Sequence, residues 1–397
     1  MNLLTVDEAR ARILARAAPL GIESALLAVA QGRVLAAPVI AARDQPPFAA
    51  SAMDGWAVRS ADAPTRLTII GESAAGHGFA GQVGPGQAVR IFTGAPLPQG
   101  ADAVVIQEDA VRDGNEVSVP AVAGSRHVRA AGLDFHAGDR LLEAGIRLDA
   151  WRLALAAAAG KANLDVFRRA RVVVMATGDE IVRPGETARA DQIFDSGSVA
   201  LASLIRSWGG QPETLAGVGD DLTSIETAVA GAGGDLIVTL GGASVGDHDL
   251  VKPALATLGL TLEVASIAMR PGKPTWFGRL ADGRPVLGLA GNPASALVCA
   301  ELFLRPLLAA LHGADTALPL IAARTTIALP ANGEREHWMR ASLRFDPNGE
   351  VSVAPFADQD SSLVTVFAAA DSLVRRRPLA VDAGPGDIVE VLPLSRH

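Results

Sequence analysis

A unit of buried strand, loop and helix recurs along residues 171–315 of this 397-residue chain and limits the folds that the chain can adopt. The runs 172–175, 236–240 and 286–289 are strand-like, and each leads into a loop of small and polar residues. Such repeats predict a parallel sheet covered by helices. Ligands bind beyond the carboxyl ends of the strands in such sheets, so we expect the three loops to line one crevice.

Helix signals follow each of these strands. The pattern predicts a helix over 198–208, a second helix that begins with the capping-box spacing of Thr223 and Glu226, and a helix near Pro253. After the last strand, Asn292 is suited to cap a helix whose first turn holds Pro293 and which runs to about Leu311.

The three loops carry the residues that we predict to form an active site. Several carboxylates in one crevice repel each other unless a cation or N–H donors balance them, and Mg²⁺ prefers such ligands. Glycines let backbone N–H groups approach anionic oxygens, and the cations of RPGKP (270–274) neutralise what remains. The loop residues are Thr177, Gly178, Asp179, Glu180, Gly241, Gly242, Ser244, Asp247, Asp249, Gly291, Asn292 and Ser295. Together they indicate chemistry on phosphate esters.

Each loop taken alone has a simpler interpretation. Asn292 and Pro293 start a helix whether or not an anion binds there, and Asp179 with Glu180 is also the sequence of a solvated turn. RPGKP is equally a proline turn with two surface cations. It is the position of all three after successive strands that favours a site.

The rest of the chain has a different character. Residues 1–44 look helical, with apolar residues continuing through Leu26, Leu27 and Val29, and 137–170 contain an Ala-rich helix (151–161) that we place beside the N-terminal helix. Residues 45–136 read as an inserted all-β module, and 316–397 repeat that pattern; each fits a small barrel or sandwich. The expected strands are 67–70, 88–92, 103–106 and 116–119, then 325–329, 341–345, 351–353 and 388–391. The fold class is therefore α/β plus β, in several domains.

Composition excludes several classes of function. The net charge is −8 without a Lys/Arg block, so nucleic acid and anionic membranes are not expected partners. Asp7 and Glu8 argue against a signal peptide, and Glu301, Arg305 and Pro306 interrupt the most apolar window, which is therefore not expected to span a membrane. We expect a cytoplasmic protein.

Cysteine and histidine add no further site. The single cysteine, Cys299, lies in an apolar helix and is expected to be core rather than nucleophile. The seven histidines have no zinc spacing, and no GxSxG, Walker or GxGxxG motif follows a strand.

Eight motifs match one known family in order and in spacing. The chain resembles, over essentially its whole length, the molybdopterin molybdenumtransferases of the MoeA type, related to the E domain of gephyrin. The matching segments are PPFAASAMDGWAV (46–58), RIFTGAPLPQGADAVVIQED (90–109), RAAGLDF (129–135), ATGDEIVRPGE (176–186), QIFDSGS (192–198), GGASVGDHD (241–249), MRPGKP (269–274) and GLAGNPASA (288–296).

The resemblance implies a reaction and an architecture. Adenylylated molybdopterin and molybdate give molybdenum cofactor and AMP, with Mg²⁺ or another divalent cation. Residues 171–315 would be a doubly wound molybdopterin-binding domain, 1–44 with 137–170 a helical linking domain, 45–136 the inserted β domain and 316–397 a C-terminal β barrel. The resemblance also implies a homodimer in which the β domain of one subunit approaches the crevice of the other. A molybdopterin adenylyltransferase and cofactor-accepting apo-enzymes are further expected partners.

The motif positions also imply residue roles. Catalytic roles fall on Asp54, Asp134, Glu180 and Asp249, and the expected metal ligands are Glu180, Asp195 and Asp249. The expected substrate-binding residues are Thr93, Arg129, Thr177, Asp195, Ser196, Gly241, Gly242, Ser244, Arg270, Lys273, Asn292, Pro293, Arg340 and Ser361.

Several residues depart from the family pattern. Gly197 stands where Asn is usual, Ala290 where Pro is usual and Asp360 where Gly is usual, while Arg270 replaces a common Lys and Ser266 a Lys of some members. Two other functions are compatible with the residues: an adenylyltransferase that uses molybdopterin and ATP, and a scaffold or carrier that binds molybdopterin without catalysis.

Overall fold

The computed structural model describes residues 3–242 and 250–394, and the chain divides into two compact units. Unit 1 contains residues 1–23, 32–36 and 165–397, and unit 2 contains residues 24–31 and 37–164. The boundary falls within β1 (Ile22–Leu26) and within β12 (Asn163–Phe167), which pair with each other.

The centre of unit 1 is a six-stranded sheet with the order β16-β13-β17-β21-β20-β18. The first four strands in this order are parallel to one another, and β20 is antiparallel to both of its neighbours, β21 and β18. The strands are β13 (Arg171–Thr177), β16 (Gln211–Val218), β17 (Leu236–Leu240), β18 (Thr261–Val264), β20 (Trp276–Arg279) and β21 (Pro285–Leu289). The predicted parallel sheet is confirmed, and the antiparallel edge is a feature that the repeat pattern did not predict.

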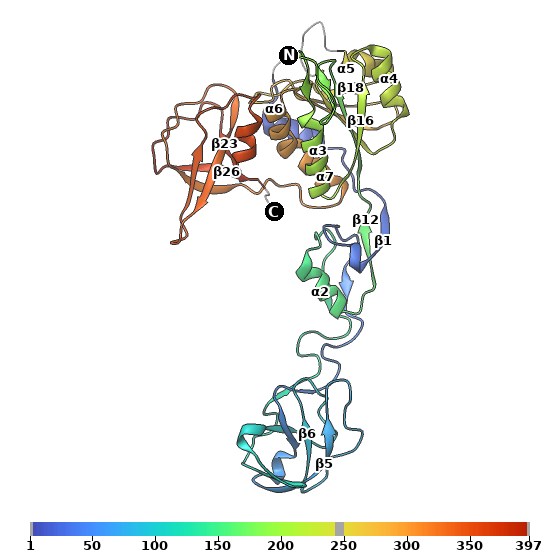
Figure 1. Ribbon diagram of the computed structural model, residues 1–397, viewed down its shortest axis with the longest axis vertical. Helices are drawn as coiled ribbons and strands as arrows, with labels where there is room; N and C mark the ends of the chain where they lie inside the picture. The colour runs from blue at the N-terminus through green and yellow to red at the C-terminus, as the bar shows by residue number, and fades with distance from the viewer. Residues whose placement is uncertain (1–2, 243–249, 395–397) are drawn as a thin grey trace. The chain divides into compact units, whose positions relative to one another are not determined.

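Helices cover both faces of this sheet (Figure 1). Successive side chains of a strand point to opposite faces. Val172 and Val174 accordingly join a core with α3 (Ser196–Ser207), α6 (Pro293–Cys299) and α7 (Arg305–Leu311). Val173 and Met175 join a second core with α4 (Leu222–Gly231) and α5 (Val251–Thr257). The domain is therefore doubly wound, as expected.

The helix starts agree only in part with the expected caps. Helix α4 begins at Leu222, and the Asp221 side chain accepts the N–H of Ser224 at 2.9 Å, so the predicted capping box of Thr223 and Glu226 is wrong. Asn292 occupies the N-cap position of α6, but its side chain makes no capping hydrogen bond. At α4 two polar candidates stand close together in the chain, and the earlier one caps the helix.

The helix after β21 is continuous but contains a π-helical turn at Ala300–Leu304 between α6 and α7. It is the one helix among the described residues with the length and apolar composition to cross a membrane. Its apolar window is 83% buried inside the protein, which is typical of the core helix of a globular domain.

The C-terminal part of unit 1 is a closed barrel. Strands β23, β24, β22, β26 and β25 pair in that order, and a β23–β25 pairing closes the ring. Their bounds are β22 (Ile321–Thr325), β23 (Glu336–Phe345), β24 (Val351–Pro355), β25 (Ser372–Arg376) and β26 (Ile388–Pro393), with β19 (Met269–Arg270) joining β23 and α8 (Val364–Ala369) before β25. The barrel is confirmed, but the strand predicted over 325–329 lies at 321–325, and β25 was not predicted.

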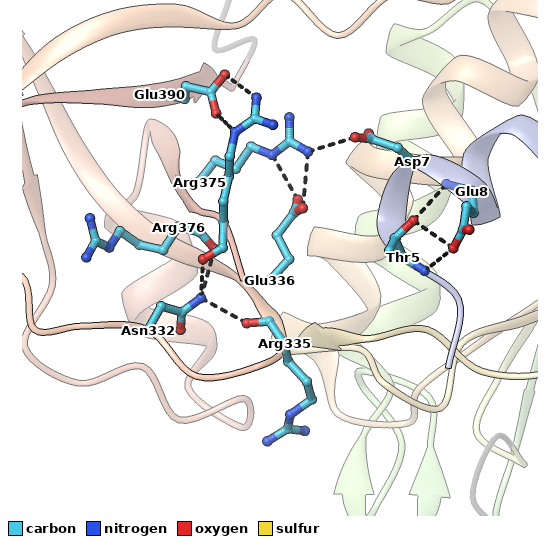
Figure 2. A network of polar contacts seen from close by, with 10 residues as sticks. Thr5, Asp7, Glu8, Asn332, Arg335, Glu336, Arg375, Arg376 and Glu390 are labelled. Carbon is cyan, nitrogen blue, oxygen red and sulfur yellow. Dashed lines mark hydrogen bonds and ion pairs between the residues drawn. The ribbon is translucent and has the colours of Figure 1, made fainter. Parts of the chain in front are cut away.

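A polar network joins the N-terminal helix α1 (Val6–Leu14) to this barrel within unit 1 (Figure 2). Thr5 and Glu8 form a capping box at the start of α1. The buried guanidinium of Arg375 donates to both oxygens of Glu336, at 2.9 and 3.1 Å, and to Asp7 at 3.2 Å. Because Glu336 begins β23 and is in register with Met269, the network holds the strand end beside the RPGKP segment.

Unit 2 contains the inserted β module. Its six-stranded sheet has the order β7-β4-β6-β5-β9-β8, made by β4 (Gly55–Val58), β5 (Thr65–Ser73), β6 (Gln87–Ile91), β7 (Ala103–Ile106), β8 (Val111–Asp113) and β9 (Glu116–Val119). Two-stranded pairs link β3 (Ala50–Ser51) with β10 (Val128–Arg129), and β2 (Val39–Ile40) with β11 (Arg140–Leu142). Short 3-10 turns occur at η2 (Ser60–Asp62) and η3 (Gln107–Asp109). All four strands expected here are present.

The region 1–44 is less helical than predicted. Helix α1 ends at Leu14, and the apolar residues 22–29 form β1 and the 3-10 turn η1 (Leu27–Val29). The predicted Ala-rich helix is present as α2 (Ala150–Ala158), which packs against η1, whereas α1 belongs to unit 1. Isolated apolar residues at mixed spacing fit a helix and a strand equally well, and here the extended pairing with β12 prevails.

Candidate functional site

A cavity of about 670 Å³ lies at the carboxyl ends of β13, β17 and β21 in unit 1. Each of the three predicted loops contributes to its lining. The predicted residues that line it are Thr177, Glu180, Asp195, Ser196, Gly241, Gly242, Gly291, Asn292 and Pro293. The sheet topology thus brings together residues that lie far apart in the chain.

Two glycines lie where these loops turn or approach each other. Gly178 has φ 138°, and a Cβ there would lie 2.5 Å from the Glu180 carboxylate. A Cβ on Gly291 would lie 3.5 Å from the Cα of Gly241, which shows how closely the second and third loops approach. A larger residue at Gly178 would have to adopt a positive φ that L residues rarely adopt, whereas a Cβ on Gly291 would make an ordinary van der Waals contact.

Glu180 and Asp195 are the carboxylates of this cavity. Glu180 is exposed and forms no side-chain hydrogen bond or ion pair among the described residues. Asp195 caps α3, since one of its oxygens accepts the N–H of Ser198 at 2.8 Å. Its second oxygen forms no hydrogen bond within the described part of the chain and lies at the positive end of the helix dipole.

A second cavity, of about 390 Å³, adjoins the first because Pro274, Ala290 and Asn292 line both. Its lining includes three cationic side chains, those of Arg270, Lys273 and Arg335. Within residues 3–242 and 250–394, none of these three cations has an ion-pair partner. Unpaired cations in a concave surface favour an anion.

Ser361 lies in the loop that closes the second cavity. Its hydroxyl accepts a hydrogen bond from Asn292 Nδ2 at 2.9 Å, and its carbonyl accepts one from the N–H of Ala294. This tether joins the loop before α8 to the start of α6.

Arg340 occupies a different place from the one expected. Its side chain is 1% exposed, lines neither cavity, and donates to the carbonyl oxygens of Asp360 and Leu363 and to Gln359 Oε1. It therefore supports the loop that carries Ser361, and a direct contact of Arg340 with substrate stays a prediction.

The positive potential near the second cavity also acts on His337, the register partner of Arg270. Burial and the nearby cations Arg270, Arg340, Arg335 and Arg376 lower the pKa of His337 from 6.5 to about 4. The folded protein thus keeps this imidazole neutral at pH values where the unfolded chain protonates it.

Because His337 is neutral in the folded state, we expect the folded protein to lose stability as the pH is lowered. Between about pH 6.5 and pH 4 the unfolded state binds a proton that the folded state does not, so the free energy of unfolding decreases as the pH falls through this window. Thermal midpoints of the wild type and of His337→Asn, compared at pH 7 and pH 5, test this. The wild type should lose more stability than the variant; equal losses would contradict the shift.

Four predicted residues lie in unit 2. Asp54 accepts two hydrogen bonds from Thr93, from the backbone N–H at 2.7 Å and from the hydroxyl at 2.8 Å, and these bonds lower the pKa of Asp54. Arg129 lies on β10 and pairs with Ala50 on β3. Asp134 is exposed beside the bridge of Gln45 and Phe135. The use of these residues in the same site as the unit 1 cavity stays a prediction.

Ser244, Asp247 and Asp249 lie outside the described residues. No group of three or more His, Cys, Asp or Glu side chains suited to a metal occurs in the described part of the chain. The expected set of Glu180, Asp195 and Asp249 is therefore represented by its first two members, which share one cavity.

Sequence patterns did not reveal every residue of the site. Arg335 precedes β23 in an exposed segment, and nothing in its spacing connects it with RPGKP. Ile193 and Phe194 also line the first cavity, although an apolar pair before a helix gives no chemical signal. Cys299 is buried and its pKa is raised to about 12 by burial, as expected for a core cysteine.

Gly197 lies in the first turn of α3. A Cβ there would lie 3.1 Å from a methyl carbon of Leu240. Because Asp195 already caps the helix, the glycine does not remove the cap.

Comparisons with known proteins match successive parts of the chain to related families. Residues 4–160 match the MoeA N-terminal region (domain I and II), residues 173–310 a probable molybdopterin binding domain, and residues 322–394 the MoeA C-terminal region (domain IV). A molybdopterin molybdenumtransferase of Haemophilus influenzae is 32% identical, with 99% of each chain covered. One from Nostoc sp. is 37% identical over 79% of this chain and 75% of its own.

A solved structure has the same fold. The molybdopterin biosynthesis moea protein from Pyrococcus horikosii matches with a TM-score of 0.85 and 31% identity, covering 100% of both chains. Sequence and fold lead to the same conclusion: the chain belongs to the molybdopterin molybdenumtransferase family, whose members are enzymes of molybdenum cofactor biosynthesis.

Proposed function

We propose that the crevice of unit 1 inserts molybdenum from molybdate into adenylylated molybdopterin and releases AMP in the presence of Mg²⁺. One observation carries this proposal: among the described residues, a cavity lined by the carboxylates of Glu180 and Asp195 adjoins a cavity lined by three cations without a described ion-pair partner, and the two share Pro274, Ala290 and Asn292. A pyrophosphate-linked nucleotide with its metal ion and a tetrahedral oxyanion need opposite charges at neighbouring positions. The two cavities offer that arrangement.

The carboxylates fit a magnesium ion. Mg²⁺ is usually bound by one or two carboxylates, with waters and substrate phosphates completing its coordination. Glu180 and Asp195 provide hard oxygen ligands with at least one oxygen each not engaged in a hydrogen bond among the described residues. When bound, the ion would polarise the pyrophosphate of the substrate.

The other residues would bind and orient the substrates. Arg270, Lys273 and Arg335 would neutralise molybdate or phosphate oxygens, with Ser361 adding a hydroxyl. Backbone N–H groups of the glycine-rich loops and the first turn of α3 would hold further oxygens. Molybdenum would be received by the dithiolene sulfurs of the substrate, so the protein needs no cysteine at this site.

A turnover experiment tests the proposal. Purified protein is incubated with adenylylated molybdopterin, molybdate and Mg²⁺, and AMP release is followed together with transfer of active cofactor to an apo-enzyme. We expect both, and we expect both to stop when a chelator removes the divalent cation. Consumption of ATP with molybdopterin alone would instead identify an adenylyltransferase, and stoichiometric binding without AMP release a carrier.

We also propose that the protein is a cytoplasmic homodimer. In unit 2 the side chain of Trp151 on α2 is 84% exposed, and exposed Leu26 and Val29 lie directly before and at the end of the η1 turn that packs against α2. Such a group of exposed apolar side chains on neighbouring elements is typical of a protein interface.

Trp151→Glu should therefore weaken dimerisation. Burial of a charge in place of a tryptophan anchor costs ~2 kcal/mol or more, equivalent to an increase of about 30-fold in the dissociation constant. Sedimentation equilibrium measures it. Val111→Glu is the control, since Val111 is exposed on β8 of the same unit. A monomeric wild type, or equal dissociation constants for wild type and Trp151→Glu, would rule out this interface.

A further inference from the structure

The first cavity has an exposed apolar wall that the proposed chemistry of charges does not use. Ile193 and Phe194 on β15 (Ile193–Phe194) are 57% and 50% exposed, and Val364 at the start of α8 is 41% exposed. All three line the cavity. Large apolar side chains open to water lose the free energy that burial would supply, so their place in a cavity favours a ligand that covers them.

Backbone pairing holds this wall beside the segments that carry the two carboxylates. Strand β15 pairs with β14 (Ile181–Val182) in parallel, with Ile181 opposite Ile193 and Val182 opposite Phe194. The N–H of Ile193 donates to the carbonyl of Glu180 at 2.7 Å, and the N–H of Asp195 donates to that of Val182 at 2.8 Å. Ile193 is thus hydrogen-bonded to the backbone of Glu180, and Phe194 directly precedes Asp195 in the chain.

That position selects the kind of ligand. A group that covers Phe194 must lie close to the phosphate oxygens that the carboxylates would hold through Mg²⁺. The ring system of a nucleotide or of a pterin phosphate lies at such a short distance from its phosphate. The Phe194 side chain is half exposed, and it makes no ring or cation contact among the described side chains, so its ring is accessible to a ligand. Aromatic faces bind planar rings by stacking.

We propose that Phe194, supported by Ile193 and Val364, binds a planar heteroaromatic ring of the substrate and sets the specificity of the cavity for it. The proposal rests on the proposed function, because it is the adenylylated pterin that would bring such rings to the site. The purine and the pterin share this chemistry, and separate probes distinguish them.

Binding of three probes to the full-length protein tests the proposal. AMP carries the purine, a free pterin carries the pterin ring, and inorganic pyrophosphate carries no ring; each is titrated in the presence of Mg²⁺ by calorimetry. Phe194→Ala should weaken binding of AMP, of the pterin or of both by about tenfold, within the range for loss of one stacked base. Pyrophosphate binding should not change, and Phe194→Tyr should restore wild-type affinity for the ring.

Phe345→Ala is the matched control, because Phe345 is an exposed phenylalanine at the end of β23 that lines no described cavity of the site. Unchanged affinities of Phe194→Ala for AMP and for the pterin would overturn the proposal. So would an equal loss for pyrophosphate, or a changed dimer dissociation constant with unchanged ring binding, which would make Phe194 a protein contact.

The outcome is separate from that of the turnover experiment. If wild-type protein binds a ring through Phe194 but releases no AMP during turnover, the ring subsite stands and the proposed reaction fails. If turnover proceeds normally and Phe194→Ala binds every probe like the wild type, the reaction stands and the subsite fails.

Discussion

Glu180→Gln should lower the rate of AMP release at least about 100-fold while the protein remains folded. The change keeps the shape of the side chain and removes one charge from the expected Mg²⁺ site. Stabilisation by a bound metal is worth several kcal/mol, and each ~1.4 kcal/mol corresponds to a factor of ten in rate. Glu180 forms no described side-chain contact, so its loss costs the fold little.

Glu186→Gln provides the control for this measurement. Glu186 is an exposed carboxylate of the same loop that does not line the cavity, and the variant should have the wild-type rate. Thermal midpoints of both variants are measured in parallel. Wild-type turnover by Glu180→Gln at low Mg²⁺ would remove Glu180 from the reaction.

Glu336→Ala should be strongly destabilising. The Glu336 carboxylate and the Arg375 guanidinium are both buried, and Arg375 also lies over the Trp338 ring, 5.5 Å from its centroid. Removal of one partner leaves the other charge buried without compensation, which costs about 3–5 kcal/mol. Asp7 remains beside Arg375 (Figure 2) and compensates part of its charge, which moves the expected loss toward the lower end of that range. The compensation is incomplete because the Asp7 side chain is exposed.

Glu390→Ala is the matched control on the same barrel. Glu390 pairs with Arg377 at 2.8 Å, but both side chains are exposed, and such surface pairs contribute about 0–1 kcal/mol. Urea unfolding followed for the barrel should therefore separate the two variants clearly. Equal midpoints would contradict a structural role for the buried pair.

The sheet could be predicted well because burial leaves a direct record in the amino-acid sequence. In the run 172–175 every residue is apolar, since both faces of β13 are covered by helices. The loops that follow such parallel strands meet at one edge whatever their sequence. The gathering of Thr177, Gly241 and Asn292 in one cavity therefore follows from the strand pattern alone.

Other parts could not be predicted because they depend on contacts distant in sequence. Residues 22–29 have helix-compatible spacing, and only the pairing of β1 with β12 makes them extended. Arg335 joins Arg270 and Lys273 because β23 pairs with β19. Arg340 is turned toward the loop of Asp360 by hydrogen bonds that no local pattern encodes.

The location of the divalent cation tests the central claim most directly. A crystal of the protein with AMP and Mn²⁺, which replaces Mg²⁺ and scatters anomalously, should show the ion bonded to Glu180 and Asp195 at about 2.1 Å, with phosphate oxygens completing its coordination. Mn²⁺ bound elsewhere, with AMP present and both carboxylates free of metal, would contradict the assignment of this crevice as the active site.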